Sequence, residues 1–174
     1  MRATLCHLFK YKAALRLAVV LLWLPCTLFA GKVSEGMLLP APEMGDTCTV
    51  CGMFVSKYPE WLATVHYRDG HSDHFDGAKD MFKYLFNLDK YAPGHSREDI
   101  TAIGVTEYYG LTMVDAHRAW FVVGSDVMGP RGQELVPLAS QEDAEEFLKD
   151  HQGERILTFD QVDRVLLTEM DEES

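Results

Sequence analysis

The 174-residue sequence lacks the residue patterns on which most enzyme classes depend. It has no Ser, His and Asp in the order of a known triad and no glycine-rich phosphate loop. It also has no paired carboxylates in a context suited to acid–base catalysis. We therefore predict no catalytic residues and no enzymatic turnover.

Basic residues are scarce beyond residue 30. The first thirty residues hold four of the sixteen Lys and Arg residues and no acidic residue, so the remainder has 12 basic against 27 acidic residues and a net charge of −15. Such a surface repels nucleic acid and anionic membranes. We expect no nucleic-acid partner, and we expect the acidic tail, residues 169–174, to be solvated and frayed.

The first thirty residues are typical of a secretory signal peptide. A basic start precedes an apolar run from Leu17 to Ala30, which is short for a membrane span, and "LFA" before Gly31 fits a cleavage site. We predict that residues 1–30 are removed and that the product enters the periplasm or cell envelope. The alternative is a lipid anchor on Cys26, for which the preceding "LWLP" is a poor match. The protein would contact a membrane only if it carried that anchor.

Cysteine is equally scarce in the predicted mature chain. Of four cysteines, Cys6 and Cys26 lie in the leader, which leaves Cys48 and Cys51 in "DTCTVCGMFV". Haem attachment is excluded because Gly52 stands where the motif needs His. A disulfide between them would close a very short loop and stabilise little. A thiol–disulfide oxidoreductase would need a βαβ context, whereas an irregular arm precedes this pair.

Two metal sites remain open to the cysteine pair. A zinc-binding structural module could add His71 and His74, but in a strand these two side chains would point to opposite faces. Thiolates and thioethers together select Cu(I). Met53 lies two residues after Cys51, and Met128 lies in the Gly- and Pro-rich loop 124–133, where no period marks it as core. The sequence favours copper, with Cys51, Met53, Cys48 and Met128 as candidate ligands.

The hydrophobic pattern predicts an α+β fold. Apolar residues alternate from Ala63 to Tyr67, as in a half-buried strand, and Asp69-Gly70 is a typical hairpin turn before a second strand in "HSDHF". We expect Asp76 to cap a helix, whose apolar face would be Ala78, Met81, Phe82 and Leu85. A strand at 100–110 would follow.

The second half repeats the order strand, strand, helix, strand. Strands are predicted at 118–123, at 134–138, where Pro137 favours a sheet edge, and at 155–159; helices are expected after Ser140 and after Thr158, which pairs with Gln161. We predict an extended arm at residues 31–47. Two small related ββαβ units would follow, residues 48–110 and 111–168, each sheet covered by helices.

Several motifs together resemble the NosL family: "CGM", "FDG" with the following "DMF", and "MGPRG" before "ELVP". The resemblance spans residues 45–166 and implies two related ββαβ units, a Cu(I) site near "CGM", and delivery of copper to nitrous-oxide reductase. Cys51 and Met53 match the central motif, Cys48 a less uniform member of it, and Met128 the loop methionine. Family members are usually lipoproteins, from which the context of Cys26 departs. The expected function is an exported Cu(I) chaperone for an apo copper enzyme, either nitrous-oxide reductase or another exported one.

Overall fold

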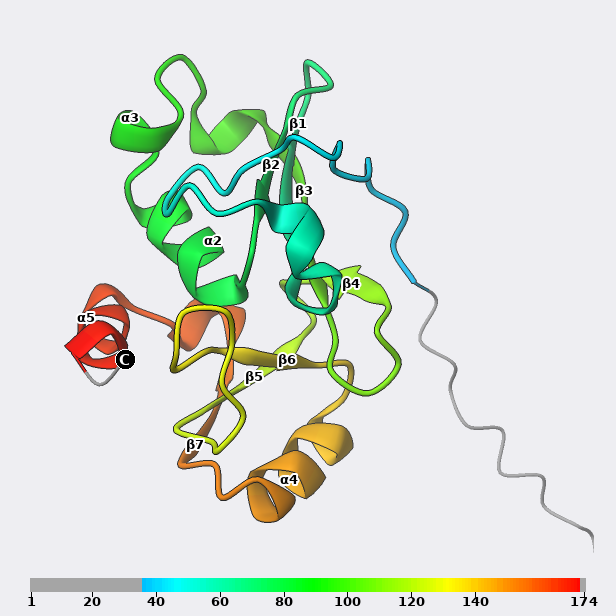
Figure 1. Ribbon diagram of the computed structural model, residues 1–174, viewed down its shortest axis with the longest axis vertical. Coiled ribbons are helices and arrows are strands. Elements are labelled where there is room, and N and C mark those ends of the chain that lie inside the picture. The colour runs from blue at the N-terminus through cyan, green and yellow to red at the C-terminus, as the bar shows by residue number, and fades with distance from the viewer. Residues whose placement is uncertain (1–35, 173–174) are drawn as a thin grey trace, which may run out of the picture. The chain divides into compact units, whose positions relative to one another are not determined.

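The computed structural model describes residues 36–172, which contain two antiparallel sheets and four α-helices (Figure 1). This confirms the predicted α+β class. The predicted signal peptide and the cysteines Cys6 and Cys26 lie outside the described residues. Within residues 36–172 no helix is long and apolar enough to cross a membrane.

The first sheet has the strand order β2-β1-β3-β4, with every neighbouring pair antiparallel. Its strands are β1 Ala63–Tyr67, β2 Ser72–Phe75, β3 Ile100–Thr106 and β4 Met113–Asp115. The predicted β1–β2 hairpin is confirmed, and Gly70 turns it with a φ of 92° that favours glycine. Sequence reasoning missed β4, whose three residues are too few to show an alternating pattern.

The second sheet has the order β6-β5-β7 and is also antiparallel. Its strands are β5 Trp120–Val123, β6 Val136–Leu138 and β7 Arg155–Thr158. The edge position of β6 confirms the expectation from Pro137, which has no N–H to donate. In both sheets the first strand lies between the two that follow it, as in β2-β1-β3 and β6-β5-β7. However, β4 lies after the predicted unit boundary at residue 110 and still pairs with β3 of the first sheet. The division into two related units stays a prediction.

Helices pack against both sheets and against each other. They are α2 Ala78–Phe86, α3 Leu88–Tyr91, α4 Gln141–Asp150 and α5 Arg164–Glu172, with 3-10 turns at Val55–Lys57, Pro59–Trp61, Arg97–Asp99 and Phe159–Gln161. Helix α2 contacts β1, β2 and α5, and α4 contacts all three strands of the second sheet. All four residues of the predicted α2 face are buried, and the Ser140 hydroxyl caps α4 by accepting from the Asp143 N–H.

The start of α2 differs from the prediction. Gly77, not Asp76, is the N-cap residue, and no side chain of its own segment caps the helix. Instead the buried carboxylate of Glu134, far along the chain, accepts from the Lys79 N–H at 2.6 Å. A side chain at Gly77 would collide with this carboxylate. The distant cap leaves Asp76 available for another contact.

The C-terminal segment also differs from the prediction. Thr158 and Gln161 cap the 3-10 turn, while α5 begins only at Arg164, after Asp163 accepts from the Leu166 N–H at 2.9 Å. Val165 on this helix is exposed. Residues 169–172, expected in a frayed tail, form the last turn of α5, where Met170 is buried.

Candidate metal centre

The CxxC segment forms a tight hairpin. Thr47 and Phe54 pair at its base, the Cys48 N–H donates to the Met53 carbonyl at 2.8 Å, and the Gly52 N–H donates to the Cys48 carbonyl at 2.8 Å. Gly52 adopts a φ of 79°, which explains the glycine that follows Cys51. Figure 1 shows this hairpin, drawn in cyan, running over α2. The backbone alone therefore holds the two cysteines in a fixed arrangement.

Two carboxylates face the two thiols. The Cys48 thiol donates to Asp80 Oδ2 at 3.4 Å, and the Cys51 thiol donates to the carboxylate of Asp76 at 3.3 and 3.4 Å. One donor atom from each of these four residues lies within 4.8 Å of the others. We call this group the thiol–carboxylate site. Cys48, Asp76 and Asp80 are buried, and Cys51 is half-buried.

The carboxylates come together because of local chain geometry. Asp76 follows β2 directly, and Asp80 lies four residues on, in the first turn of α2, so both can face the same neighbour. Sequence reasoning did not identify either as a site residue. The available signal was their position in the "FDG" and "DMF" motifs, because two acidic residues four apart at a predicted helix start can share one face.

Burial keeps the thiols protonated. It raises the pKa of the Cys48 thiol far above its ordinary value of 9.0, and the negative charges of Asp80 and Asp76 raise it further. Burial also raises the pKa of Cys51, as does the hydrogen bond to Asp76. The nucleophile in disulfide exchange is a thiolate, usually one with a lowered pKa. These electrostatics therefore oppose the oxidoreductase alternative.

Two cationic side chains contact Asp80. Lys83 Nζ lies 3.5 Å from Oδ1, and Arg131 Nη1 lies 3.6 Å from Oδ2. Arg131 belongs to loop 124–133, whose backbone is tied to α2 because the Arg131 carbonyl accepts from Lys79 Nζ at 3.1 Å. A residue from the second half of the chain therefore reaches the thiol–carboxylate site.

The two candidate methionines lie on two different segments, the CxxC hairpin and loop 124–133. Met53 is half-buried at the end of the hairpin, where its carbonyl holds Cys48. Met128 is 54% exposed on the same loop as Arg131. Loop 124–133 approaches the site through Arg131, and the roles of Met53 and Met128 as ligands stay predictions.

The histidines of the zinc alternative lie elsewhere. His74 is buried, with Nδ1 3.0 Å from the Thr64 hydroxyl, and His71 stacks with His95 beside Asp73. Among the described residues, the group that could hold a metal contains both cysteines and neither histidine. The Cys2His2 set is therefore not formed among these residues.

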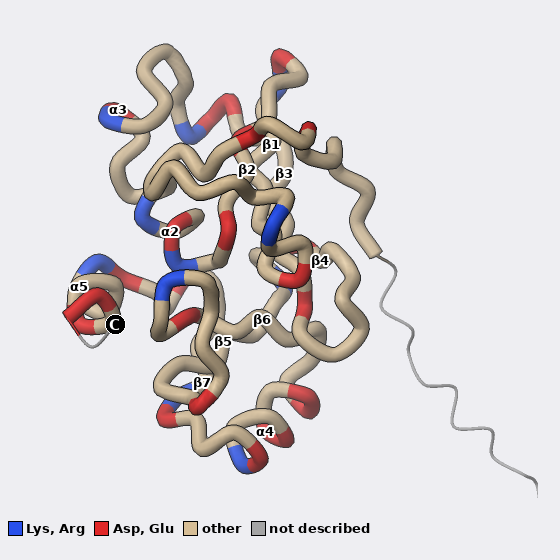
Figure 2. Tube along the Cα trace, viewed as in Figure 1, with Lys and Arg blue, Asp and Glu red and all other residues tan. Residues whose placement is uncertain are grey.

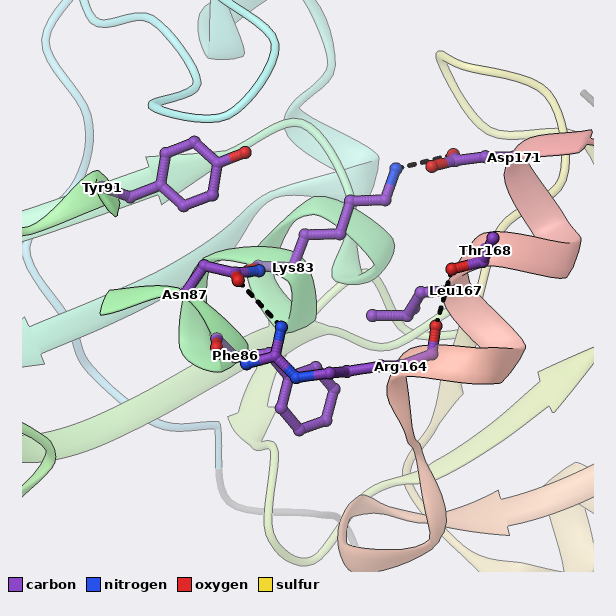
Figure 3. A pocket seen from close by; sticks show the side chains of 8 residues that line it. All are labelled: Lys83, Phe86, Asn87, Tyr91, Arg164, Leu167, Thr168 and Asp171. Carbon is purple, nitrogen blue, oxygen red and sulfur yellow. Dashed lines mark hydrogen bonds and ion pairs between the residues drawn. The ribbon is translucent and has the colours of Figure 1, made fainter. Parts of the chain in front are cut away.

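A cavity of about 200 Å³ lies between α2, α3 and α5, and no cysteine lines it (Figure 3). Its lining includes Lys83, whose ammonium lies 2.6 Å from Asp171 on α5. Lys83 therefore joins this cavity to the thiol–carboxylate site through its second contact, with Asp80.

Comparison with known proteins identifies the family. The NosL family model matches residues 41–167, which is most of the chain. The chain belongs to the NosL family. Over 57 residues it is 37% identical to the copper-binding lipoprotein NosL of Stutzerimonas stutzeri, a match that spans 33% of this chain and 30% of that protein.

A solved NosL structure shares the fold. The crystal structure of the copper chaperone NosL from Shewanella denitrificans superposes with a TM-score of 0.61 and covers 74% of this chain and 97% of its own. The two sequences are 21% identical, so this likeness establishes the NosL fold alone.

Proposed function

We propose that this protein is an exported copper chaperone that binds Cu(I) through Cys48 and Cys51 and passes it to an apo copper enzyme. The observation that carries the proposal is a preformed pair of buried and half-buried thiols in a NosL-family fold. Thiolates are soft ligands that Cu(I) prefers. Copper is here the cargo, and the proposal includes no catalytic step.

Copper binding would exchange protons for metal. Both thiols are hydrogen-bonded to carboxylates, and their pKa values are raised, so Cu(I) must displace thiol protons. The carboxylates of Asp76 and Asp80 are hard ligands that suit Cu(I) poorly. Their role would be to orient the sulfurs, and the affinity would remain low enough for release.

The thioethers would complete the copper site. Met53 is two residues from Cys51 and could supply a third sulfur, and Met128 could supply a fourth from loop 124–133. A thioether needs no deprotonation, so it would bind at any pH. An exposed Met128 would suit transfer, because an outer ligand can be replaced first by a donor of the receiving protein.

The client enzyme is expected to be nitrous-oxide reductase, because the family resemblance implies that partner. Any partner would meet a strongly acidic chain, since α4 alone carries five acidic residues (Figure 2). Complementary basic patches on the client would guide docking, and added salt would weaken the contact. The lipoprotein name of the Stutzerimonas relative supports a location in the cell envelope. Cleavage before Gly31 and an anchor on Cys26 remain the two alternatives.

Titration of the reduced protein with Cu(I) tests the proposal. In competition with a calibrated chelator, the protein should take about one Cu(I), and Cys51→Ser should abolish tight binding because a hydroxyl is a poor Cu(I) ligand. Ser56→Ala, which alters an exposed hydroxyl bonded to the Met44 carbonyl, is a matched control and should bind normally. Retention of tight copper binding by Cys51→Ser would refute the site.

A further inference from the structure

The residues of the thiol–carboxylate site suit Zn(II) as well as Cu(I), and a copper chaperone must discriminate between the two metals. Two cysteines and two aspartates also suit Zn(II), which accepts tetrahedral sets of sulfur and oxygen donors. Asp80 is the critical member of the set, because it is only 3% exposed and its Oδ1 makes no hydrogen bond among the described residues. A buried carboxylate oxygen beside a thiol is a natural ligand for a divalent cation.

Cationic side chains already compensate this carboxylate. Lys83 contacts Oδ1 of Asp80 at 3.5 Å. Its ammonium lies closer to Asp171, at 2.6 Å (Figure 3), so its charge is shared between the two aspartates. Arg131 contacts Oδ2, the same oxygen that accepts the Cys48 thiol. The Arg131 guanidinium therefore contacts the same Asp80 oxygen that is hydrogen-bonded to the candidate ligand Cys48.

We propose that Arg131 is the residue that makes this site selective for Cu(I) over Zn(II). By pairing with Asp80, the guanidinium withholds this carboxylate from the metal, which leaves the two sulfurs and only one of the two aspartates, Asp76, as available donors. Its fixed positive charge also repels a divalent ion twice as strongly as a monovalent one at the same position. The inference rests on the proposed function, because it concerns discrimination at the same site.

The loop geometry allows Arg131 to be tested without losing the fold. The Arg131 carbonyl accepts from Lys79 Nζ, and this bond holds the loop backbone without help from the guanidinium. The side chain is 41% exposed, so its replacement should leave no buried cavity. Solvent screening at this exposure also limits the expected effect to the lower end of the range for groups beside a metal ligand.

The experiment measures Zn(II) and Cu(I) affinities of the reduced protein separately, each by competition with a calibrated chelator. Arg131→Gln should raise the Zn(II) affinity about tenfold, while the Cu(I) affinity changes less than about threefold because sulfur donors dominate it. Arg131→Lys retains the charge and should keep zinc binding weak. Arg118→Gln, which removes an exposed arginine from the β4–β5 turn, controls for net charge and should change neither affinity.

A second variant locates the effect at Asp80. Adding Asp80→Asn to Arg131→Gln removes the released carboxylate and should return Zn(II) affinity to the original value. Unchanged zinc affinity in Arg131→Gln, or a gain that persists in the double variant, would overturn the inference. These outcomes differ from failure of the proposed function, in which the unmodified protein would bind no Cu(I) tightly. Thermal melts of each variant establish that the fold is retained.

Discussion

The slope of copper affinity against pH should reveal how many cysteine thiolates bind Cu(I). Both thiols donate hydrogen bonds to carboxylates, and burial raises both pKa values above 9.0. At pH 6–8 the metal-free protein therefore holds both thiol protons, and each cysteine that binds Cu(I) must release one. Each released proton makes the binding constant rise about tenfold per pH unit. With two thiolate ligands, affinity should rise about a hundredfold per unit and about ten-thousandfold from pH 6 to pH 8.

The sign follows from the direction of the pKa shifts. Copper binds the deprotonated form, and the raised pKa values make that form rarer, so affinity increases with pH throughout this window. The assay is chelator competition across pH, corrected for titration of the chelator. Cys48→Ser should reduce the slope to about tenfold per unit, because one displaced proton is lost. An affinity that stays flat in the unmodified protein between pH 6 and pH 8 would refute the assignment of protonated thiols as ligands.

Three further results are expected. Met53→Leu should weaken Cu(I) binding about 10–100-fold, at a cost in folding stability below about 1.5 kcal/mol. Lower stability with unchanged Cu(I) affinity would instead identify Met53 as a core residue. Met128→Leu should cause a smaller loss of Cu(I) affinity. Burial raises the pKa of Glu134 from 4.5 to about 7, so the contribution of Glu134 to folding stability should fall by about 3 kcal/mol as pH rises from 4.5 to 7. Glu134→Gln should remove this fall in thermal melts. An equal fall in the variant would show that Glu134 is not the titrating group. Mass spectrometry of envelope fractions should find Gly31 at the mature N-terminus, and a lipid on Cys26 would contradict that prediction.

The sequence predicted the elements of the fold well wherever one local rule decided them. The Asp69-Gly70 turn, the apolar face of α2, the Ser140 cap and the edge position of Pro137 each depend on residues a few positions apart. The last helix was placed too early because Thr158 and Gln161 satisfy a capping pattern that a short 3-10 turn also satisfies. Local patterns specify that a cap exists, but not the length of the helix behind it.

The candidate site was only half predictable, for a different reason. The cysteine pair is visible in sequence, but its carboxylate neighbours depend on how α2 packs under the hairpin. Asp76 looked like a helix cap because an acidic residue before a helix usually is one. No local pattern could show that Glu134, more than fifty residues away, already caps this helix.

The remote cap links the fold to the proposed function. Had Asp76 capped α2, its carboxylate would face the first-turn N–H groups and could not accept the Cys51 thiol. Glu134 replaces it at the helix start, and the chain that leads to Glu134 is the loop that carries Arg131 and Met128. The same loop therefore releases Asp76 toward Cys51, brings a cation to Asp80 and presents the candidate outer ligand. A shift of this loop away from α2 would change all three at once, so docking of a client on loop 124–133 would act directly on the thiol–carboxylate site.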